Sequence, residues 1–335
     1  MSAEESTPKP GEFDLIRHLA DAAGRYDNDV PRPAAVGIGD DAAVLDVDPG
    51  CQLVVTTDTL VAGVHFEADA APGDIGYKAL AVNLSDLAAM GATPAWHFLN
   101  LTGPPPDREW LGAFAAGMGE LAGSEGTQLA GGDTTGGPMS VTVTALGQVP
   151  RGQALLRSTA QPGDRIVVSG MPGLAARALR WPERSPALED AATTEAFRRL
   201  HRPRPRLALG RCLRGVAHAC IDISDGLAAD LGHILDASGL GAELWLDRLP
   251  DSPVFSGMTL ESRWNLQLGG GDDYELCFTV PDAAGDLSAL EEAAGVALTV
   301  IGRIRKGAGL DCIDADGAAF SPRTAGWDHF RSDPA

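Results

Sequence analysis

The sequence lacks the common signatures of nucleotide-binding enzymes. Its 335 residues contain no G-x-x-x-x-G-K-[ST] loop, no H-R-D and no D-F-G, which argues against a P-loop enzyme and a protein kinase. Basic residues are scarce, because 26 Lys and Arg stand against 46 Asp and Glu and give a net charge of −20. A surface of this sign does not attract nucleic acid, and a phosphorylated ligand would need a divalent metal to screen its charge.

Cysteine, aromatic residues and long apolar runs are also few. The five cysteines include no C-x-x-C pair, so we expect neither a disulfide framework nor a zinc site but the reduced thiols of a cytoplasmic protein. Aromatic residues make up 5%, so the core must be built mainly from Ala, Val, Leu and Ile. No apolar run reaches the length of a membrane span, and the start MSAEESTPKP has no signal-peptide core, so no membrane partner is expected.

The length and the element pattern predict two domains. We expect a disordered leader over residues 1–10, an α/β domain over 11–150 and an α+β domain over 151–335, with the boundary in the turn-rich segment 150–162. The alternation of helical and strand patterns supports this mixed class, whereas the order of the strands cannot be derived from it.

Apolar periodicity and turn residues locate the individual elements. Helices are predicted over 12–24, 74–91, 107–123, 172–181, 225–238 and 283–294, and a helix with an exposed connection within 182–206. A strand–turn–strand is predicted over 34–45, and strands over 52–57, 140–149, 164–170, 220–224, 242–246, 275–280 and 297–304. The strand over 52–57 is expected to end just before Asp58.

Aspartates recur beside Gly or Thr where apolar segments end. The clusters are Gly39-Asp40-Asp41, Thr56-Thr57-Asp58, Gly131-Gly132-Asp133-Thr134-Thr135, Asp222-Ile223-Ser224-Asp225-Gly226 and Gly270-Gly271-Asp272-Asp273-Tyr274-Glu275. One such cluster is ordinarily a turn. Carboxylate and hydroxyl oxygens nevertheless suit a hard cation such as Mg²⁺, and Gly lets phosphate approach backbone N–H groups. Five clusters in one chain favour a metal–phosphate site.

Asp86 adds a carboxylate within an apolar helix pattern. Asn83 and Asp86 are three residues apart and share one face of the helix predicted over 74–91. Burying a carboxylate without a partner costs several kcal/mol. A functional role for Asp86 is therefore favoured over a structural one.

Three further side chains are candidate ligand contacts. His65 follows the Asp58 cluster, Arg157 lies at the predicted domain boundary, and Trp327 is an aromatic residue near the C-terminus. An arginine can pair with phosphate, and an aromatic ring can stack on a flat cation. Ordinary surface roles explain all three equally well at this stage.

The stretch Asp314-Ala315-Asp316-Gly317 has the spacing of part of a calcium loop. In that register Cys312 would take the first ligand position and Arg323 the last, where a bidentate Glu belongs. We therefore predict a hairpin turn at these four residues.

Taken in order, the motifs resemble those of the thiamine-monophosphate kinases. They are GEFDLI at 11–16, GIGDDAAVL at 37–45, TTDTLVAGVHF at 56–66, YKALAVNLSDLAAMGATPAW at 77–96, GGDTT at 131–135, IDISDGLAADLGHI at 221–234, GGDDYELCFT at 270–279 and GWDHF at 326–330. The resemblance implies an α/β plus α+β, two-domain fold like that of aminoimidazole ribonucleotide synthetase. It also implies a homodimer in which the four-stranded N-terminal sheets pair, with ATP and several Mg²⁺ between the domains.

The resemblance further assigns roles to individual residues. It implies metal ligands at Asp41, Thr56, Thr57, Asp58, Asp86, Asp133, Asp222 and Asp225, of which Asp86 and Asp133 are the expected catalytic pair. It implies ATP contacts at Gly132, Asp133, Arg157 and Ser224, and substrate contacts at His65, Asp273 and Trp327. Two departures are mild: the family often has GGED at 270–273, and some members have Tyr in place of Trp327.

The implied reaction is in-line transfer of the ATP γ-phosphoryl group to thiamine monophosphate, the last step of thiamine diphosphate biosynthesis. A related selenophosphate synthetase would be expected to carry a reactive Cys early in the chain, whereas the first is Cys51. A hydrogenase-maturation relative would be expected to end in Cys, whereas this chain ends SDPA. A non-catalytic module that binds ATP and Mg²⁺ stays open as an alternative.

Overall fold

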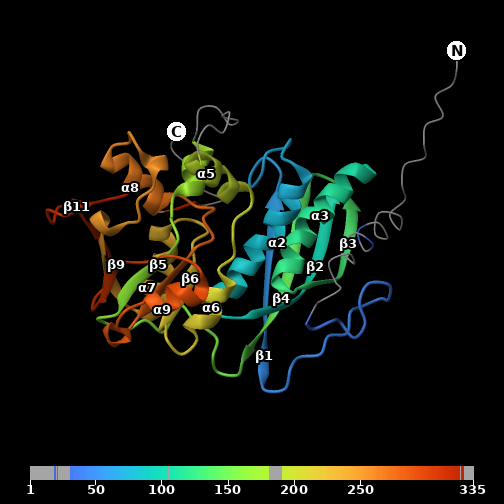
Figure 1. The fold of residues 1–335 in the computed structure, drawn as a ribbon, viewed down its shortest axis with the longest axis horizontal. Helices are drawn as coiled ribbons and strands as arrows, with labels where there is room; N and C mark the ends of the chain where they lie inside the picture. Colours follow the sequence, from blue (N-terminus) through green and yellow to red (C-terminus); the bar gives the residue numbers. More distant parts are fainter. Residues whose placement is uncertain are drawn as a thin grey trace, which may run out of the picture. The chain divides into compact units, whose positions relative to one another are not determined.

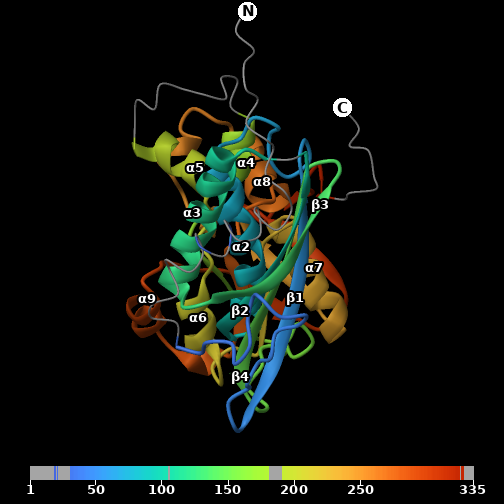
Figure 2. The same ribbon diagram turned by 90° about the vertical axis from the view of Figure 1, so that its right-hand side faces the viewer.

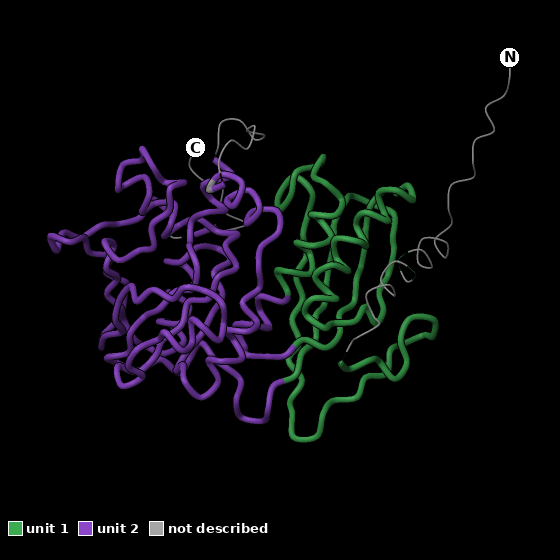
Figure 3. Tube along the Cα trace, in the orientation of Figure 1, with its two compact units in different colours: residues 1–83, 94–148 green, residues 84–93, 149–335 purple. Residues whose placement is uncertain are grey.

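The computed structural model describes residues 19, 21, 31–104, 106–180, 191–324 and 326–327. The chain forms two compact units, residues 1–83 with 94–148 and residues 84–93 with 149–335 (Figure 3). The unit boundary at 148–149 lies beside the predicted boundary, but segment 84–93 groups with the second unit, so a single division at 150 stays a prediction. The expected leader and most of the helix expected over 12–24 lie outside the described residues.

The first unit is a four-stranded sheet with two long helices along one face (Figures 1 and 2). Its elements are β1 (Cys51–Val61), α2 (Pro72–Ala89), β2 (Thr93–Gly103), α3 (Arg108–Glu125), β3 (Gln128–Gly136) and β4 (Ser140–Pro150). The strand order is β1-β4-β2-β3, so β1 is an edge strand, and β2 and β3 run parallel. The four-stranded sheet that the resemblance implied is confirmed.

The two helices begin and end at residues that their sequences predict. Pro72 stands at the first position of α2, and Asp74 lies in its first turn. Asp107 caps α3 by accepting the Trp110 N–H at 2.7 Å, and Gly126 ends α3 in the left-handed region with φ 68°. No described helix is long and apolar enough to cross a membrane.

Close contact between α2 and α3 depends on glycine. A Cβ added at Gly117 would lie 1.8 Å from the Gly73 carbonyl oxygen, and one added at Gly76 would lie 2.1 Å from the Phe114 oxygen. The main chains therefore approach each other where any side chain would clash. His97 of β2 lies among apolar residues on the α3 side of the sheet, where burial lowers its pKa to about 3.

The second unit has a seven-stranded sheet in the order β11-β10-β7-β9-β5-β8-β6. Its strands are β5 (Arg165–Ser169), β6 (Ala219–Asp222), β7 (Gly241–Trp245), β8 (Leu276–Val280), β9 (Leu298–Arg305), β10 (Gly309–Ile313) and β11 (Ala319–Phe320). Its helices are α4 (Leu174–Leu179), α5 (Ala191–His201), α6 (Leu207–Leu213), α7 (Leu227–Ser238), α8 (Leu260–Gly269) and α9 (Ser288–Ala294), with short 3₁₀ turns at Leu246–Arg248, Pro253–Phe255 and Asp282–Ala284.

The core of this unit covers both the edge strand β6 and its neighbour β8. Every residue of β6 and β8 is buried, as expected for strands covered on both faces. Leu231 and Ile234 of α7 pack into the same core as Ile166 of β5. The ends of these strands, including Asp222, are thereby fixed by the core.

Most of the predicted elements are confirmed, with two corrections. The strand expected to end before Asp58 continues to Val61, because the β-branched Thr59 and Val61 extend the strand pattern. The strand–turn–strand expected over 34–45 is reduced to an isolated antiparallel bridge between Val36 and Val44. The hairpin expected at 314–317 is confirmed, since β10 and β11 pair antiparallel across it.

We expect Gly117→Ala to lower the free energy of unfolding by at least about 2 kcal/mol, because the new methyl group must force α2 and α3 apart. Gly232→Ala is the matched control. A Cβ at Gly232 in α7 has nothing within 4 Å, so this change should be neutral or stabilising by up to about 1 kcal/mol. Urea denaturation of both variants measures the difference, and equal midpoints would contradict the close approach.

Candidate active site

The predicted metal ligands divide between the two units. Asp41, Thr56, Thr57, Asp58 and Asp133 belong to the first unit, and Asp86, Asp222 and Asp225 belong to the second. Among the described residues, no three His, Cys, Asp or Glu side chains form a group that could hold a metal ion. The ligand set therefore stays a prediction.

In the first unit, β1 separates the members of its cluster. Side chains alternate along a strand, so Thr56 and Asp58 lie on one face and Thr57 on the other. The Thr57 hydroxyl lies 3.3 Å from the Val143 carbonyl oxygen and 3.0 Å from the Thr144 hydroxyl, both on β4. Thr57 is thus engaged across the sheet, while Thr56 and Asp58 can act together.

The other two predicted carboxylate ligands of this unit, Asp133 and Asp41, are exposed. Asp133 is exposed on β3, opposite Asn100 of the parallel strand β2, and its carboxylate accepts the Thr135 hydroxyl at 3.2 Å. Gly132 lies one residue before it, opposite Leu99. Asp41 is exposed in the loop before β1, where its N–H donates to Asp40.

His65 is held in place by groups around it. Its Nδ1 accepts the Val61 N–H at 3.0 Å, so a neutral ring carries its proton on Nε2. The buried Lys78 of α2 donates to the His65 carbonyl oxygen at 3.2 Å. Lys78 was not singled out in the sequence, although a lysine inside an apolar helix pattern is a signal of such a role.

In the second unit, the last turns of α2 meet the end of β6. The Ser85 hydroxyl donates to Asp222 at 2.7 Å, and both residues are buried. Asp86 follows Ser85 and is partly exposed, although most of the helix around it is buried. The expectation of a carboxylate on an apolar helix face is therefore met, and Ser85 is an additional member that the sequence reasoning missed.

The loop from Ser224 to Gly226 is shaped by a residue that the sequence analysis did not select. Asp230, in the first turn of α7, accepts the N–H groups of Ser224, Asp225 and Gly226 at 3.0 to 3.1 Å. Burial raises the pKa of Asp230 to about 7, although these bonds favour its ionised form. An acidic residue in a first helical turn is a capping signal that could have identified it.

The two adjacent aspartates of the GGDD motif have different surroundings. Asp273 is buried and accepts the N–H groups of Gly173 at 2.7 Å and Ala175 at 3.4 Å at the start of α4. Burial raises its pKa well above the ordinary range. Asp272 is partly exposed and accepts the Tyr274 hydroxyl at 3.0 Å. The sequence prediction of a substrate contact at Asp273 stays untested, and Asp272 is the more accessible carboxylate.

Arg157 and Trp327 are both exposed side chains of the second unit. The Arg157 carbonyl oxygen accepts the Ser238 hydroxyl at 3.0 Å, which ties this loop to the end of α7. Trp327 is 52% exposed, and its N–H donates to the Asp225 carbonyl oxygen at 2.9 Å. The Trp327 backbone is therefore attached to the loop that carries Ser224 and Asp225.

The chemistry of these donors fits Mg²⁺. Carboxylate and hydroxyl oxygens are the ligands that hard cations prefer, and the second unit places Asp222, Asp225 and Asp86 on segments joined by Ser85. Asp222 is only 4% exposed, and a carboxylate at such depth needs hydrogen bonds or a cation to offset its burial. These residues could hold part of a metal site.

The chain matches two family models, described as the AIR synthase related protein N-terminal domain over 39–149 and C-terminal domain over 161–314. Among curated proteins it is 45% identical over 323 residues to the thiamine-monophosphate kinase of Escherichia coli K12, covering 96% of this chain and 98% of that protein.

The chain is also similar to solved structures of thiamine-monophosphate kinases. The thiamine-monophosphate kinase of Stenotrophomonas maltophilia K279a is similar with a TM-score of 0.82 and 47% identity, over 90% of this chain and 97% of that one. A structure described as AaThiL complexed with AMPPCP and TMP has a TM-score of 0.73 and 28% identity, over 98% of this chain and 100% of that one.

We expect Asp273→Ala to lower the free energy of unfolding by about 2–4 kcal/mol, because it leaves the buried Gly173 N–H without an acceptor and opens a gap at α4. Asp107→Ala removes an exposed helix cap and should cost only about 1 kcal/mol. Denaturant titration compares the two. If Asp273→Ala had the same free energy of unfolding as the wild type, the capping role would be wrong. The predicted substrate contact would then be the one role left for Asp273.

Proposed function

Because the chain belongs to the thiamine-monophosphate kinase family, whose domains are those of the AIR synthase related proteins, we propose that it transfers the γ-phosphoryl group of ATP to thiamine monophosphate. The products are thiamine diphosphate and ADP, in the last step of thiamine diphosphate biosynthesis. The observation that carries the proposal is 45% identity to a curated family member over 96% of this chain. The complex of a related enzyme with AMPPCP and TMP supports the same pair of substrates.

The acceptor explains why the chain needs no strong general base. A phosphate acceptor is already ionised, so the barrier comes mainly from bringing two anions together. Mg²⁺, when bound, would supply the neutralising charge. The ligands proposed to hold it are Asp41, Thr56, Thr57, Asp58, Asp86, Asp133, Asp222 and Asp225. Rate enhancement would then rest on positioning and electrostatic stabilisation by the chain.

Four residues are proposed to contact ATP in this reaction: Gly132 and Asp133 of β3, Arg157 and Ser224. A guanidinium suits phosphate oxygens, and the partly exposed Ser224 lies in a loop whose N–H groups are already fixed by Asp230.

The thiamine side of the substrate is a flat cationic ring system, which a carboxylate and an aromatic face can bind. Trp327 offers an indole that is 52% exposed, and the 272–273 segment offers carboxylates. Asp273 was predicted from the sequence, and the accessibility of Asp272 makes it the alternative. His65 would approach the substrate through Nε2, since its Nδ1 is engaged by Val61.

A homodimer formed through the first unit is also proposed. The edge strand β1 exposes Leu53, Val55 and Val61 by 44%, 56% and 37%. An exposed apolar edge strand is a site at which a second sheet can pair.

The cysteines bear on the compartment in which the protein works. All five cysteines are free thiols, which fits a reducing compartment such as the cytoplasm.

Phosphorus NMR of the pure protein with ATP, MgCl₂ and thiamine monophosphate should show thiamine diphosphate and ADP forming together. Asp86→Asn should lower kcat/KM by at least about 100-fold, as loss of an electrostatic stabiliser does, without changing the far-UV spectrum. Asp236→Asn, an exposed carboxylate on α7, is the control and should keep full activity. Binding of ATP without ADP formation would instead favour the non-catalytic module.

We expect light scattering to give twice the mass of one chain for the wild type and the single mass for Val55→Lys, because a charge on the β1 face opposes sheet pairing. Leu260→Lys changes another exposed leucine, on α8 of the second unit, which is 60% exposed, and should leave the mass unchanged. A Val55→Lys protein that stays dimeric would place the interface elsewhere.

A further inference from the structure

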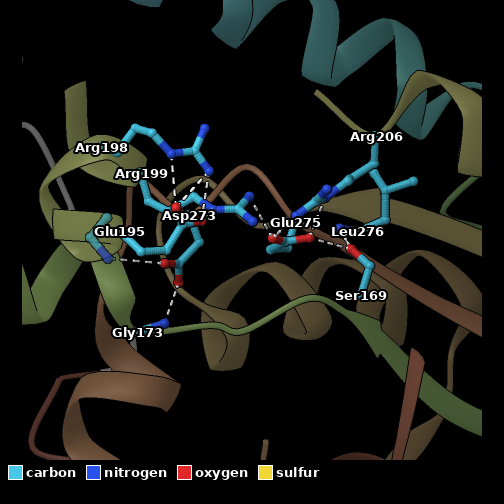
Figure 4. A network of polar contacts seen from close by, with 10 residues as sticks. Ser169, Gly173, Glu195, Arg198, Arg199, Arg206, Asp273, Glu275 and Leu276 are labelled. Atoms are coloured by element: carbon cyan, nitrogen blue, oxygen red, sulfur yellow. Dashed lines mark hydrogen bonds and ion pairs between the residues drawn. The ribbon is translucent and has the colours of Figure 1, made fainter. Parts of the chain in front are cut away.

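Glu275, the residue just before β8, is the centre of a buried ion cluster to which the sequence analysis gave no role (Figure 4). Its side chain is 3% exposed, and its carboxylate accepts the Arg206 Nε–H at 2.6 Å and a second Arg206 N–H. Arg199 of α5 donates to it at 3.3 Å, and Ser169 at the end of β5 donates at 2.6 Å. Three residues from separate segments, Arg206, Arg199 and Ser169, thus meet at one carboxylate.

The Glu275 carboxylate packs tightly against the Gly170 backbone. A Cβ added at Gly170, whose φ is +55°, would lie 2.2 Å from the Glu275 Oε1 atom. The Ser169 hydroxyl that donates to Glu275 also accepts the Leu276 N–H at 2.9 Å. The position of the Glu275 backbone is therefore set from both its side chain and the next residue.

The segment just before Glu275 has an unusual backbone. Asp272 and Tyr274 have φ of 67° and 50°, and no other non-glycine residue in the described part of the chain has positive φ. Such conformations cost free energy and persist only where the surroundings enforce them. Asp273 between them accepts the Gly173 N–H at the start of α4, so the middle of the segment is fixed as well.

Backbone hydrogen bonds also connect this segment to the end of β6. The Ile223 N–H donates to the Glu275 carbonyl oxygen, the Tyr274 N–H to that of Ile223 and the Asp272 N–H to that of Ser224, all at 2.8 Å. The loop with the proposed ATP contact Ser224 is therefore bonded residue by residue to the segment with Asp272.

We propose that Glu275, clamped by Arg199 and Arg206, is a positioning residue that enforces the strained Asp272–Tyr274 backbone and so aims the Asp272 carboxylate at the thiamine part of the substrate. This inference rests on the proposed function. Glu275 with Arg199 and Arg206, here called the clamp, acts through the backbone and does not touch the substrate. A cluster that served stability alone would tie β8 to α5 equally well, but it would not need to adjoin the one strained segment that bears an accessible carboxylate.

The test uses Glu275→Gln and Arg206→Met, with Arg206→Lys as the conservative variant and Arg198→Met as the control. Arg198 lies beside Arg199 on α5 but bonds Glu195 rather than Glu275. Glu275→Gln and Arg206→Met should raise the KM for thiamine monophosphate about 10-fold or more and change the KM for ATP less than 3-fold. Arg206→Lys should recover part of the loss, and Arg198→Met should match the wild type.

Hydrogen exchange with mass spectrometry separates this proposal from the proposed function. In Glu275→Gln, peptides covering 271–276 should exchange at least about 10-fold faster, while peptides from β9 stay protected. Local loosening together with a higher KM supports the clamp. A lower melting temperature with unchanged KM and unchanged local exchange overturns it. If the wild type makes no thiamine diphosphate, the proposed function fails, and local exchange with calorimetric binding of thiamine monophosphate still decides whether the clamp exists.

Discussion

Repulsion between two phosphate groups is the constraint on which the proposed site depends. A chain with a net charge of −20 adds to this repulsion, so the carboxylates proposed to approach the phosphates are useful only as ligands of a cation. The structure places Asp58 and Asp133 within the strands β1 and β3, Asp86 on the helix α2 and Asp222 at the end of the wholly buried β6.

The elements that the sequence predicts well are those with strong local patterns. The helix around Asp86 and the strand β4 follow from periodicity and from Gly and Pro at their ends. The extent of β1 was underestimated, because an aspartate was assumed to end a strand that its Thr and Val neighbours continue. The strands β2 and β3 were not assigned, since β2 includes Pro94 and β3 contains adjacent glycines and polar residues, and their pairing in the order β4-β2-β3 cannot be read from the sequence.

For the site, sequence motifs identify which residues matter more readily than what each one does. Neighbours in a strand face opposite ways, so Thr57 is turned toward β4 while Thr56 and Asp58 share the other face. Asp272 and Asp273 differ in burial, which no motif reveals. Glu275 was included in an acidic cluster, but its role was missed because its partners Arg199 and Arg206 are distant in sequence. Asp230 was missed because it acts on backbone N–H groups rather than on side chains.

The buried imidazole of His97 has a consequence for handling this protein. Because burial lowers its pKa to about 3 in the folded protein, against about 6.5 in the unfolded chain, the unfolded chain binds a proton that the native chain does not bind. The native state therefore loses up to about 1.4 kcal/mol per pH unit as the pH falls between these two values. The isoelectric point of 4.6 lies inside that interval. Acidification toward pH 4.6 therefore lowers the electrostatic repulsion between molecules and the stability of the fold together.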